Sequence, residues 1–231
     1  MPAKPKVAIV DYGLGNLFSV KHACGHAGLD AAITSDSDEI LASRAVILPG
    51  VGAFRDAMEA LVREDLVAVL KDVVASGTPL IGICLGMQLL MSESQEFGSS
   101  PGLGIVEGDV VRLKDSEEHG RRLKVPHIGW SRIDRRRGNG DSTAADRWRA
   151  SLIEEVPDRS FMYFVHSYYT RPADSGVILS TTRYGPVDFC STLRKERVFG
   201  CQFHPERSGP LGLRVYHRLH QLLISTSQYQ I

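Results

Sequence analysis

A cysteine between two glycines, at the point where a strand pattern changes to a helix pattern, constrains the fold of this chain most strongly. Residues 79–90 read PLIGICLGMQLL, so an apolar run leads into Cys84, with Gly82 and Gly86 two positions to either side. This is the cysteine form of the G-x-S-x-G nucleophile elbow, in which a strained strand-to-helix turn exposes the reactive atom. The N-terminus of the following helix favours a thiolate. We therefore expect Cys84 to be a nucleophile rather than a buried structural cysteine.

A second motif, near the C-terminus, supplies a candidate base. Residues 202–209 read QFHPERSG. Side chains two apart in extended backbone point the same way, so His204 and Glu206 are expected to converge. A carboxylate beside an imidazole selects its tautomer and stabilises the imidazolium. Alone, this pair also fits a surface His and Glu at a strand end, but together with the elbow it predicts a Cys-His-Glu triad.

A third segment supplies candidate oxyanion donors. Residues 49–54 read PGVGAF and follow a buried-type strand at 45–48. Two glycines in four residues permit backbone amides to point at a developing negative charge. We expect donors at Val51 and Gly52, and another at the amide of Leu85, directly after the nucleophile. An ordinary strand-to-helix turn explains the same segment equally well.

The composition excludes several other classes of protein. The chain has 231 residues, is 43% hydrophobic and has a formal net charge of zero, so it can bury a core and has no overall basic field for nucleic acid or an anionic membrane. No apolar stretch reaches membrane-spanning length, and a signal-peptide core is lacking. The cysteines form no C-x-x-C pair. We expect a cytoplasmic enzyme with one domain over 1–231, no metal and no cofactor.

The order of strand and helix patterns predicts the fold class. Apolar runs at 6–10, 45–48 and 80–83 alternate with helix patterns, one of them over about 56–75. This predicts an α/β fold with a mixed, mostly parallel central sheet and helices on both faces. Strand patterns separated by turn signals predict an added antiparallel portion, at 103–113, 161–169, 177–182, 188–193 and 198–203. A final helix is expected from Ser208.

The three motifs together resemble the triad-type, class I glutamine amidotransferases. Further segments, all in one order, narrow the resemblance to the glutaminase subunits of imidazole glycerol phosphate synthase, from histidine biosynthesis. These segments are DYGLGNL at 11–17, PHIGW at 126–130 and FVHSYY at 164–169, in one order with the motifs PGVGAF at 49–54, GICLGMQLL at 82–90 and QFHPERSG at 202–209.

The resemblance spans nearly the whole chain, with two departures. Ser131 replaces an asparagine that usually follows the PHIGW segment, and we expect this change to be tolerated because it lies outside the triad. The stretch 134–149 is longer and more polar than usual. Within it, 135–146 is expected to be flexible and Arg135, Arg136 and Arg137 to lie in a solvated loop.

The resemblance implies hydrolysis of the glutamine side-chain amide. Cys84 attacks the carboxamide carbon, His204 carries protons and Glu206 orients His204. Gln88, one turn after the nucleophile, is expected to contact the α-amino or carboxylate group of the substrate.

The resemblance also places Gly52, Ser167 and Tyr168 near the bound glutamine. A strand exit packed on the core is the alternative for Ser167 and Tyr168. His127 and His166 fall in family segments and are expected to be structural or near an interface.

The resemblance further implies a protein partner. In this family the ammonia passes to a cyclase subunit of (βα)8-barrel fold, in a heterodimer that makes imidazole glycerol phosphate and aminoimidazole carboxamide ribonucleotide. No cyclase domain is recognisable in this chain, so a separate partner is expected. The glycine-rich segment 11–16 could instead cradle a phosphate, but it lacks a third glycine and an acidic ribose partner, and we favour a partner interface.

Two other functions remain open. A glutaminase serving pyridoxal phosphate or anthranilate synthesis would share the triad, and the segments at 11–16 and 126–130 argue against it. A catalytically silent regulatory subunit would keep the fold, and the intact Cys84, His204 and Glu206 argue against that.

Overall fold

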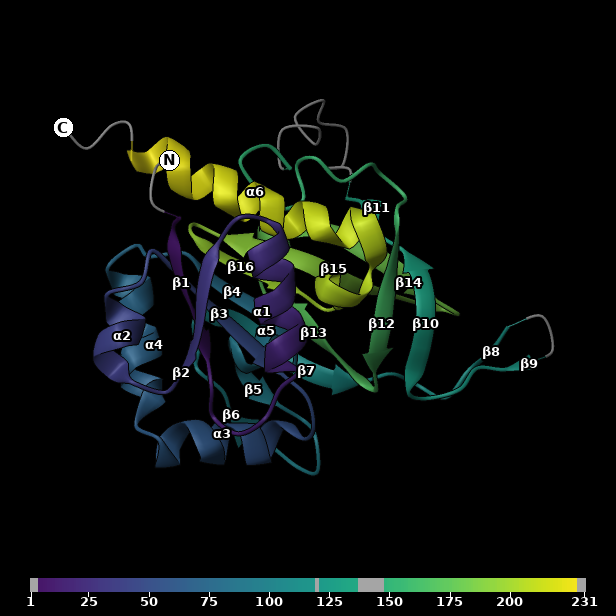
Figure 1. Cartoon of the computed structure of the whole chain (residues 1–231). Helices are drawn as coiled ribbons and strands as arrows, with labels where there is room; N and C mark the ends of the chain where they lie inside the picture. Colours follow the sequence, from purple (N-terminus) through teal and green to yellow (C-terminus); the bar gives the residue numbers. More distant parts are fainter. Residues whose placement is uncertain (1–3, 119–120, 137–147, 228–231) are drawn as a thin grey trace.

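A twisted mixed sheet forms the centre of the computed structural model, which describes residues 4–118, 121–136 and 148–227 (Figure 1). Within these residues the sheet has eight strands in the order β11-β14-β15-β16-β4-β3-β1-β2. The strands from β16 to β2 are parallel, and β15, β14 and β11 continue the sheet in antiparallel pairs. Their bounds are β1 Lys6–Val10, β2 Asp30–Thr34, β3 Ala45–Gly50, β4 Leu80–Cys84, β11 Asp134–Arg135, β14 Ile178–Tyr184, β15 Val187–Lys195 and β16 Val198–Cys201.

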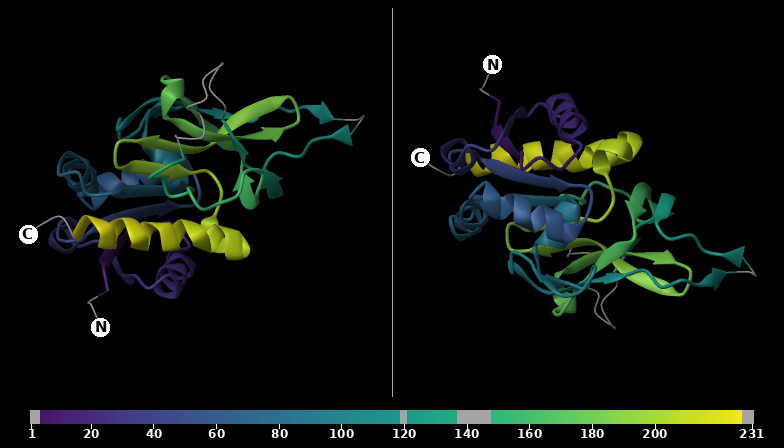
Figure 2. Two further views of the ribbon diagram at one scale, coloured as in Figure 1. Left: turned by 90° about the horizontal axis from the view of Figure 1, so that it is seen from above. Right: turned by 90° about the horizontal axis from the view of Figure 1, so that it is seen from below.

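Helices cover both faces of this sheet (Figure 2). Val7 and Ile9 of β1 pack with α1 and α6 in one core, whereas Ala8 and Val10 pack with α2, α3 and α4 in the other. Successive strand side chains point to opposite faces, which explains why these strands are apolar throughout. The helices are α1 Leu17–His26, α2 Ser37–Leu41, α3 Phe54–Arg63, α4 Leu66–Ala75, α5 Leu85–Leu89 and α6 Gly209–Ser227. None of the helices in the described part of the chain has the length and apolar composition needed to cross a membrane.

Smaller sheets lie beside the central one. A four-stranded sheet has the order β13-β7-β5-β6, and β10 pairs with β12 and β8 with β9 in antiparallel ribbons. The strands are β5 Met91–Ser94, β6 Ser100–Pro101, β7 Val106–Arg112, β8 Glu117–Glu118, β9 Arg121–Arg122, β10 His127–Arg132, β12 Phe161–His166 and β13 Tyr168–Pro172. The expected mixed α/β fold with an antiparallel portion is therefore confirmed.

The helix expected over 56–75 is wrong in one respect, because two helices occupy this stretch. Asp65 has a φ of 56°, and this left-handed conformation interrupts the helix between α3 and α4. Buried leucines lie on both sides of the break, so the apolar pattern continues through it. A short polar side chain such as aspartate tolerates this left-handed conformation better than most residues do.

The strand expected over 161–169 is also divided, into β12 and β13, at Ser167. The arginine run differs from expectation as well. Arg135 lies in β11 and pairs with Ser180 of β14. Its guanidinium lies 4.2 Å from the ring centre of Trp148, which is buried. Arg136 donates to the carbonyl of Ser175 at 3.1 Å. The contacts of Arg135 contradict a solvated loop for that residue, and residues 137–147 lie outside the described residues.

The parallel strands bring the sequence motifs to one edge of the sheet. The carboxyl ends of β1, β3, β4 and β16 meet there, so segments 11–16 and 49–53, the elbow and segment 202–208 all leave from the same side. Ligands of open α/β sheets bind outside this edge. The candidate site is therefore expected at this edge.

Candidate active site

Cys84 occupies a strained turn between β4 and α5. Its φ of 55° and ψ of −110° are unusual for a residue with a side chain, and strain of this kind costs about 1–3 kcal/mol. The flanking glycines permit the turn. A Cβ on Gly82 would come within 2.7 Å of the Met87 nitrogen, and one on Gly86 would collide with the carbonyl oxygen of Leu48. The elbow thus depends on backbone contacts that only glycine allows.

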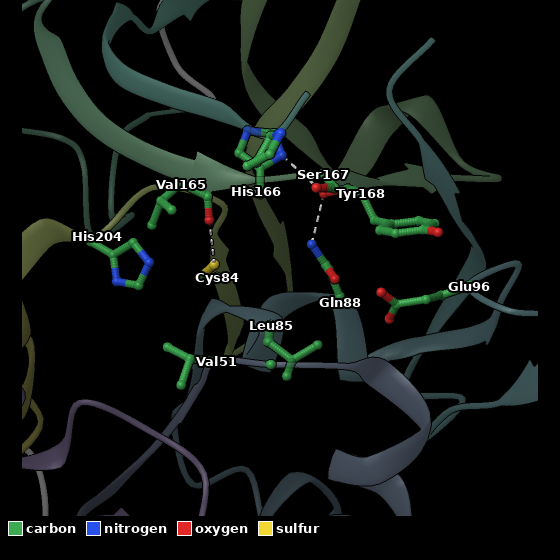
Figure 3. Close-up of a pocket in the computed structure, with 12 residues that line it drawn as sticks. Val51, Cys84, Leu85, Gln88, Glu96, Val165, His166, Ser167, Tyr168 and His204 are labelled. Carbon is green, nitrogen blue, oxygen red and sulfur yellow. Dashed lines mark hydrogen bonds between the residues drawn. The ribbon is translucent and has the colours of Figure 1, made fainter. Parts of the chain in front are cut away.

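His204 and Glu206 form a buried pair beside the cysteine. His204 Nδ1 and Glu206 Oε1 are 2.8 Å apart, and both side chains are almost fully buried. The other ring nitrogen, Nε2, has no hydrogen-bond partner among the described residues. Figure 3 shows this imidazole beside the Cys84 sulfur. The free ring nitrogen is therefore available to a reacting group at the sulfur.

The convergence of His204 and Glu206 has a different origin from the expected one. β16 ends at Cys201, and Pro205–Arg207 form a 3-10 turn rather than extended backbone. Ser208 holds this turn, because its hydroxyl donates to the His204 carbonyl at 2.7 Å and accepts from the Tyr163 amide at 2.9 Å. The turn is thereby tied to β12.

The surroundings of His204 favour its charged form. Burial lowers the pKa of His204, but the side chains of Cys84 and Glu206 outweigh burial and raise the pKa to about 10. An imidazolium beside a sulfur is the arrangement that activates cysteine nucleophiles.

A cavity of about 270 Å³ opens in front of the sulfur (Figure 3). It brings together eight of the site residues predicted from the sequence, and Glu206 contacts His204. The lining residues are Val51, Gly52, Cys84, Leu85, Gln88, Glu96, Pro126, Val165, His166, Ser167, Tyr168 and His204.

The Gln88 side chain is held in a defined orientation at the wall of this cavity. Its amide nitrogen donates to the Tyr168 carbonyl at 2.8 Å and to Gln202 Oε1 at 3.1 Å. These two bonds use both amide hydrogens. The carbonyl oxygen of Gln88 is thus the atom left to meet a ligand.

The candidate oxyanion segment lies opposite the elbow. Gly50 is the register partner of Cys84 across the β3–β4 pair, and the Tyr12 hydroxyl donates to the Pro49 carbonyl at 2.7 Å. Gly52 has a φ of 101°, which glycine adopts readily. Neither the Val51 nor the Gly52 amide donates a hydrogen bond within the described part of the chain. Both remain candidates for binding an oxyanion.

Two lining groups were not found from the sequence. Glu96 brings a carboxylate to the cavity, and its Oε2 accepts from the Phe54 amide at 2.7 Å. The Val165 carbonyl oxygen lies 3.8 Å from the Cys84 sulfur. No motif marks Glu96, because it follows β5 in an irregular polar segment, and a backbone carbonyl leaves no trace in a sequence.

Comparisons with known proteins agree with this geometry. The family "Glutamine amidotransferase class-I" matches residues 8–217. The chain is 41% identical over 210 residues to "Imidazole glycerol phosphate synthase subunit HisH" of Geobacter metallireducens, covering 90% of this chain and 94% of that protein. It is 42% identical over 218 residues to the protein of the same name from Dehalococcoides mccartyi, covering 94% and 98%.

Solved structures share the fold at low sequence identity. The crystal structure of a glutamine amidotransferase superposes with a TM-score of 0.65 at 21% identity, covering 96% of this chain and 98% of that one. PurLQS from Thermotoga maritima gives a TM-score of 0.66 at 16% identity, covering 97% and 100%. With the family match and the relatives above 40% identity, the chain belongs to the class I glutamine amidotransferases, and within them to the family of imidazole glycerol phosphate synthase subunit HisH.

Proposed function

We propose that this chain hydrolyses glutamine through Cys84, His204 and Glu206 and delivers the ammonia to a cyclase subunit of imidazole glycerol phosphate synthase. One observation carries the proposal: a cysteine at a φ of 55° lies beside a buried His204–Glu206 pair at the base of a cavity. The name of the relatives supports the choice of synthase.

The reaction proceeds in two halves. The Cys84 thiolate attacks the carboxamide carbon, and His204 donates its Nε2 proton to the leaving nitrogen, so that ammonia departs and a thioester remains. His204 then takes a proton from water, which attacks the thioester, and glutamate leaves as the thiolate re-forms. Glu206 keeps the ring oriented in both halves. The amides of Val51, Gly52 and Leu85 stabilise the oxyanion of each tetrahedral intermediate.

The cavity offers complementary groups to the zwitterionic end of glutamine. The carboxylate of Glu96 and the carbonyl oxygen of Gln88 suit an α-ammonium group, since both are acceptors. Backbone amides of Ser167 and Tyr168 are the groups that we assign to the α-carboxylate. The apolar Leu85 side chain lines the cavity between Cys84 and the groups assigned to the zwitterionic end of glutamine.

The partner is proposed to dock over the carboxyl edge of the central sheet. Large apolar side chains are exposed on elements that lead to the cavity mouth: Phe18 at 81% and Ile128 at 61%, with Trp130 at 53% and Val51 at 41%. Exposed aromatic side chains of this kind are enriched in protein interfaces. A cyclase subunit of (βα)8-barrel fold, bound here in a heterodimer, would cover the cavity and receive the ammonia.

Cys84→Ala in the assembled enzyme tests the proposal. The chain is co-purified with candidate cyclase subunits, and glutamine hydrolysis and product formation are measured. We expect the substitution to abolish glutamine-dependent synthesis while synthesis from added ammonia continues, because only the nucleophile is lost. Glutamine hydrolysis that survives in Cys84→Ala would contradict the proposal.

A further inference from the structure

Two buried histidines lie beside the cavity and have no part in the proposed reaction. His127 is 3% exposed and His166 6% exposed, and they are directly opposite each other on β10 and β12. His127 Nδ1 and His166 Nε2 are 3.2 Å apart. The outer ring nitrogens are also engaged, since His127 Nε2 lies 2.9 Å from Ser131 Oγ and His166 Nδ1 lies 2.9 Å from the Tyr168 carbonyl oxygen. The two rings thus connect Ser131 to Tyr168.

This chain of hydrogen bonds has one direction when both rings are neutral. A carbonyl oxygen only accepts, so His166 Nδ1 carries a hydrogen, and a neutral ring carries no second one. His166 Nε2 therefore accepts from His127 Nδ1, and His127 Nε2 accepts from the Ser131 hydroxyl. The Ser131 hydroxyl is thus the first donor in this chain of hydrogen bonds, since both ring hydrogens are already used.

The surroundings of the pair support neutral rings. Tyr184 stacks on His127 with ring centres 4.1 Å apart, and Phe189 lies edge-on to His166 at 4.9 Å. Burial lowers the pKa of His127 to about 4. Burial, and next the neighbouring His127, lower the pKa of His166 to about 3.

The far end of the chain meets the substrate-binding wall. The Tyr168 carbonyl that accepts from His166 also accepts from the Gln88 amide at 2.8 Å (Figure 3). We propose that Ser131 is a positioning residue, whose hydroxyl donates to the accepting nitrogen of the His127–His166 pair and thereby holds this pair, the Tyr168 carbonyl and Gln88 in place for glutamine. This inference rests on the proposed role of Gln88 in binding the substrate.

The backbone of β10 makes this contact possible. His127 and Ser131 are four residues apart, which in a straight strand would separate their Cα atoms by about 13 Å. Gly129, which carries no side chain, lies between them with a φ of 144°, a conformation that favours glycine.

Tautomer measurement tests the proton order directly. Histidine ring nitrogens of the ¹⁵N-labelled full chain are observed by long-range ¹H–¹⁵N correlation at neutral pH, with signals assigned by their loss in His127→Phe. We expect both His127 and His166 to be neutral with the hydrogen on Nδ1. A hydrogen on Nε2 of either ring in the wild-type chain would overturn the inference.

Matched substitutions at Ser131 test the effect on glutamine binding. Ser131→Thr keeps the hydroxyl. Ser131→Val has the shape of threonine but lacks the hydroxyl, and Ser131→Asn supplies an amide donor. With the synthase partner bound, we expect Ser131→Val to raise KM for glutamine about five-fold with little change in kcat, as loss of one hydrogen bond suggests. Ser131→Thr and Ser131→Asn should retain the wild-type KM.

Equal KM values for Ser131→Val and Ser131→Thr would overturn the inference. This holds even if the two variants differ in their unfolding midpoints, since that difference would indicate a structural role alone. The tautomer measurement needs no turnover. An inactive wild-type complex would therefore count against the proposed function, whereas an active one with an Nε2 hydrogen would count against the role of Ser131 alone.

Discussion

Cys84 differs from the other cysteines of the chain in what surrounds its sulfur. Burial raises the pKa of Cys24 and of Cys190 to about 12 and raises that of Cys201 as well. Cys84 instead lines the open cavity, beside His204. Among the four free cysteines of the described chain, Cys84 is thus the one that lines this cavity.

A glutamine-like electrophile, such as a chloroketone analogue, is therefore expected to modify Cys84 first under native conditions. Mass spectrometry of the labelled peptides locates the adduct. Unfolding in urea is the control, because it should make Cys24, Cys190 and Cys201 reactive as well. A native adduct on one of these three would show that burial does not protect them.

Glu206→Gln is expected to lower the pKa of His204, because it replaces a carboxylate at 2.8 Å by a neutral amide. The proton that His204 gives to ammonia is then lost at lower pH. The alkaline limb of kcat/KM should shift to lower pH, and kcat should fall by about 10²–10⁴. Rates of glutamine hydrolysis between pH 6 and 10 provide the measurement, and an unshifted alkaline limb would contradict the assignment.

The His204–Glu206 pair makes the free energy of unfolding depend on pH, and the direction of the pKa shift gives the sign of this dependence. The pKa of His204 is raised from 6.5 to about 10 on folding. The folded state therefore binds more protons between these values, and the stabilisation is full below pH 6.5 and is lost as pH rises toward 10. Urea midpoints of wild type and Glu206→Gln should converge over this range. A difference that grows with pH would contradict the charged pair.

At the scale of elements, the elbow depends on close approach between α5 and the sheet. A Cβ on Gly86 would collide with the Leu48 carbonyl of β3, which is backbone and cannot rotate away. Gly86→Ala is expected to destabilise the fold by about 1–3 kcal/mol or more. Urea unfolding provides the measurement.

Gly25→Ala is the matched control for that experiment. Gly25 lies in α1, is exposed, and a Cβ there meets nothing within 4 Å. Gly25 lies in the last turn of α1, so alanine there should stabilise by up to about 0.5–1 kcal/mol. Equal effects of the two substitutions would show that the elbow does not require glycine.

Elements that carry one continuous pattern were predictable from the sequence, and breaks within a pattern were not. β1, β3 and β4 follow from short apolar runs, since strands buried on both faces have no alternation to interrupt. The break at Asp65 left the apolar spacing intact. Likewise, the Arg135 guanidinium packs on the ring of Trp148, a tertiary contact that its polar neighbours in the sequence do not reveal.

The candidate site shows the same division. Cys84, His204 and Glu206 stand in motifs whose spacing reflects local backbone, so the sequence identified them. Glu96 reaches the cavity only because its carboxylate is held at the start of α3, 42 positions earlier in the chain. Such a contact is a property of the tertiary fold, which local patterns do not encode.

At the scale of the whole molecule, the segment opposite the elbow is both a catalytic candidate and part of the surface proposed for the partner. Val51 is 41% exposed, and its amide and that of Gly52 have no acceptor among the described residues. With a glycine on each side, the peptide at Val51 can adopt either orientation at low steric cost. Contact with a partner subunit can therefore decide which orientation is populated.

The chain alone is accordingly expected to be a poor glutaminase although its triad is assembled. An oxyanion hole acts only when its amides already point at the developing charge, and one lost donor costs about 3–4 kcal/mol, or about 100- to 1000-fold in rate. Binding of the cyclase subunit, and then of its substrate, should raise kcat more than it lowers KM, because the interaction exists only in the transition state. Steady-state glutamine hydrolysis is measured for the chain alone, with partner, and with partner and ligand. Equal kcat in the three states would show that the site is already organised in the free chain, and that the partner receives ammonia without controlling its release.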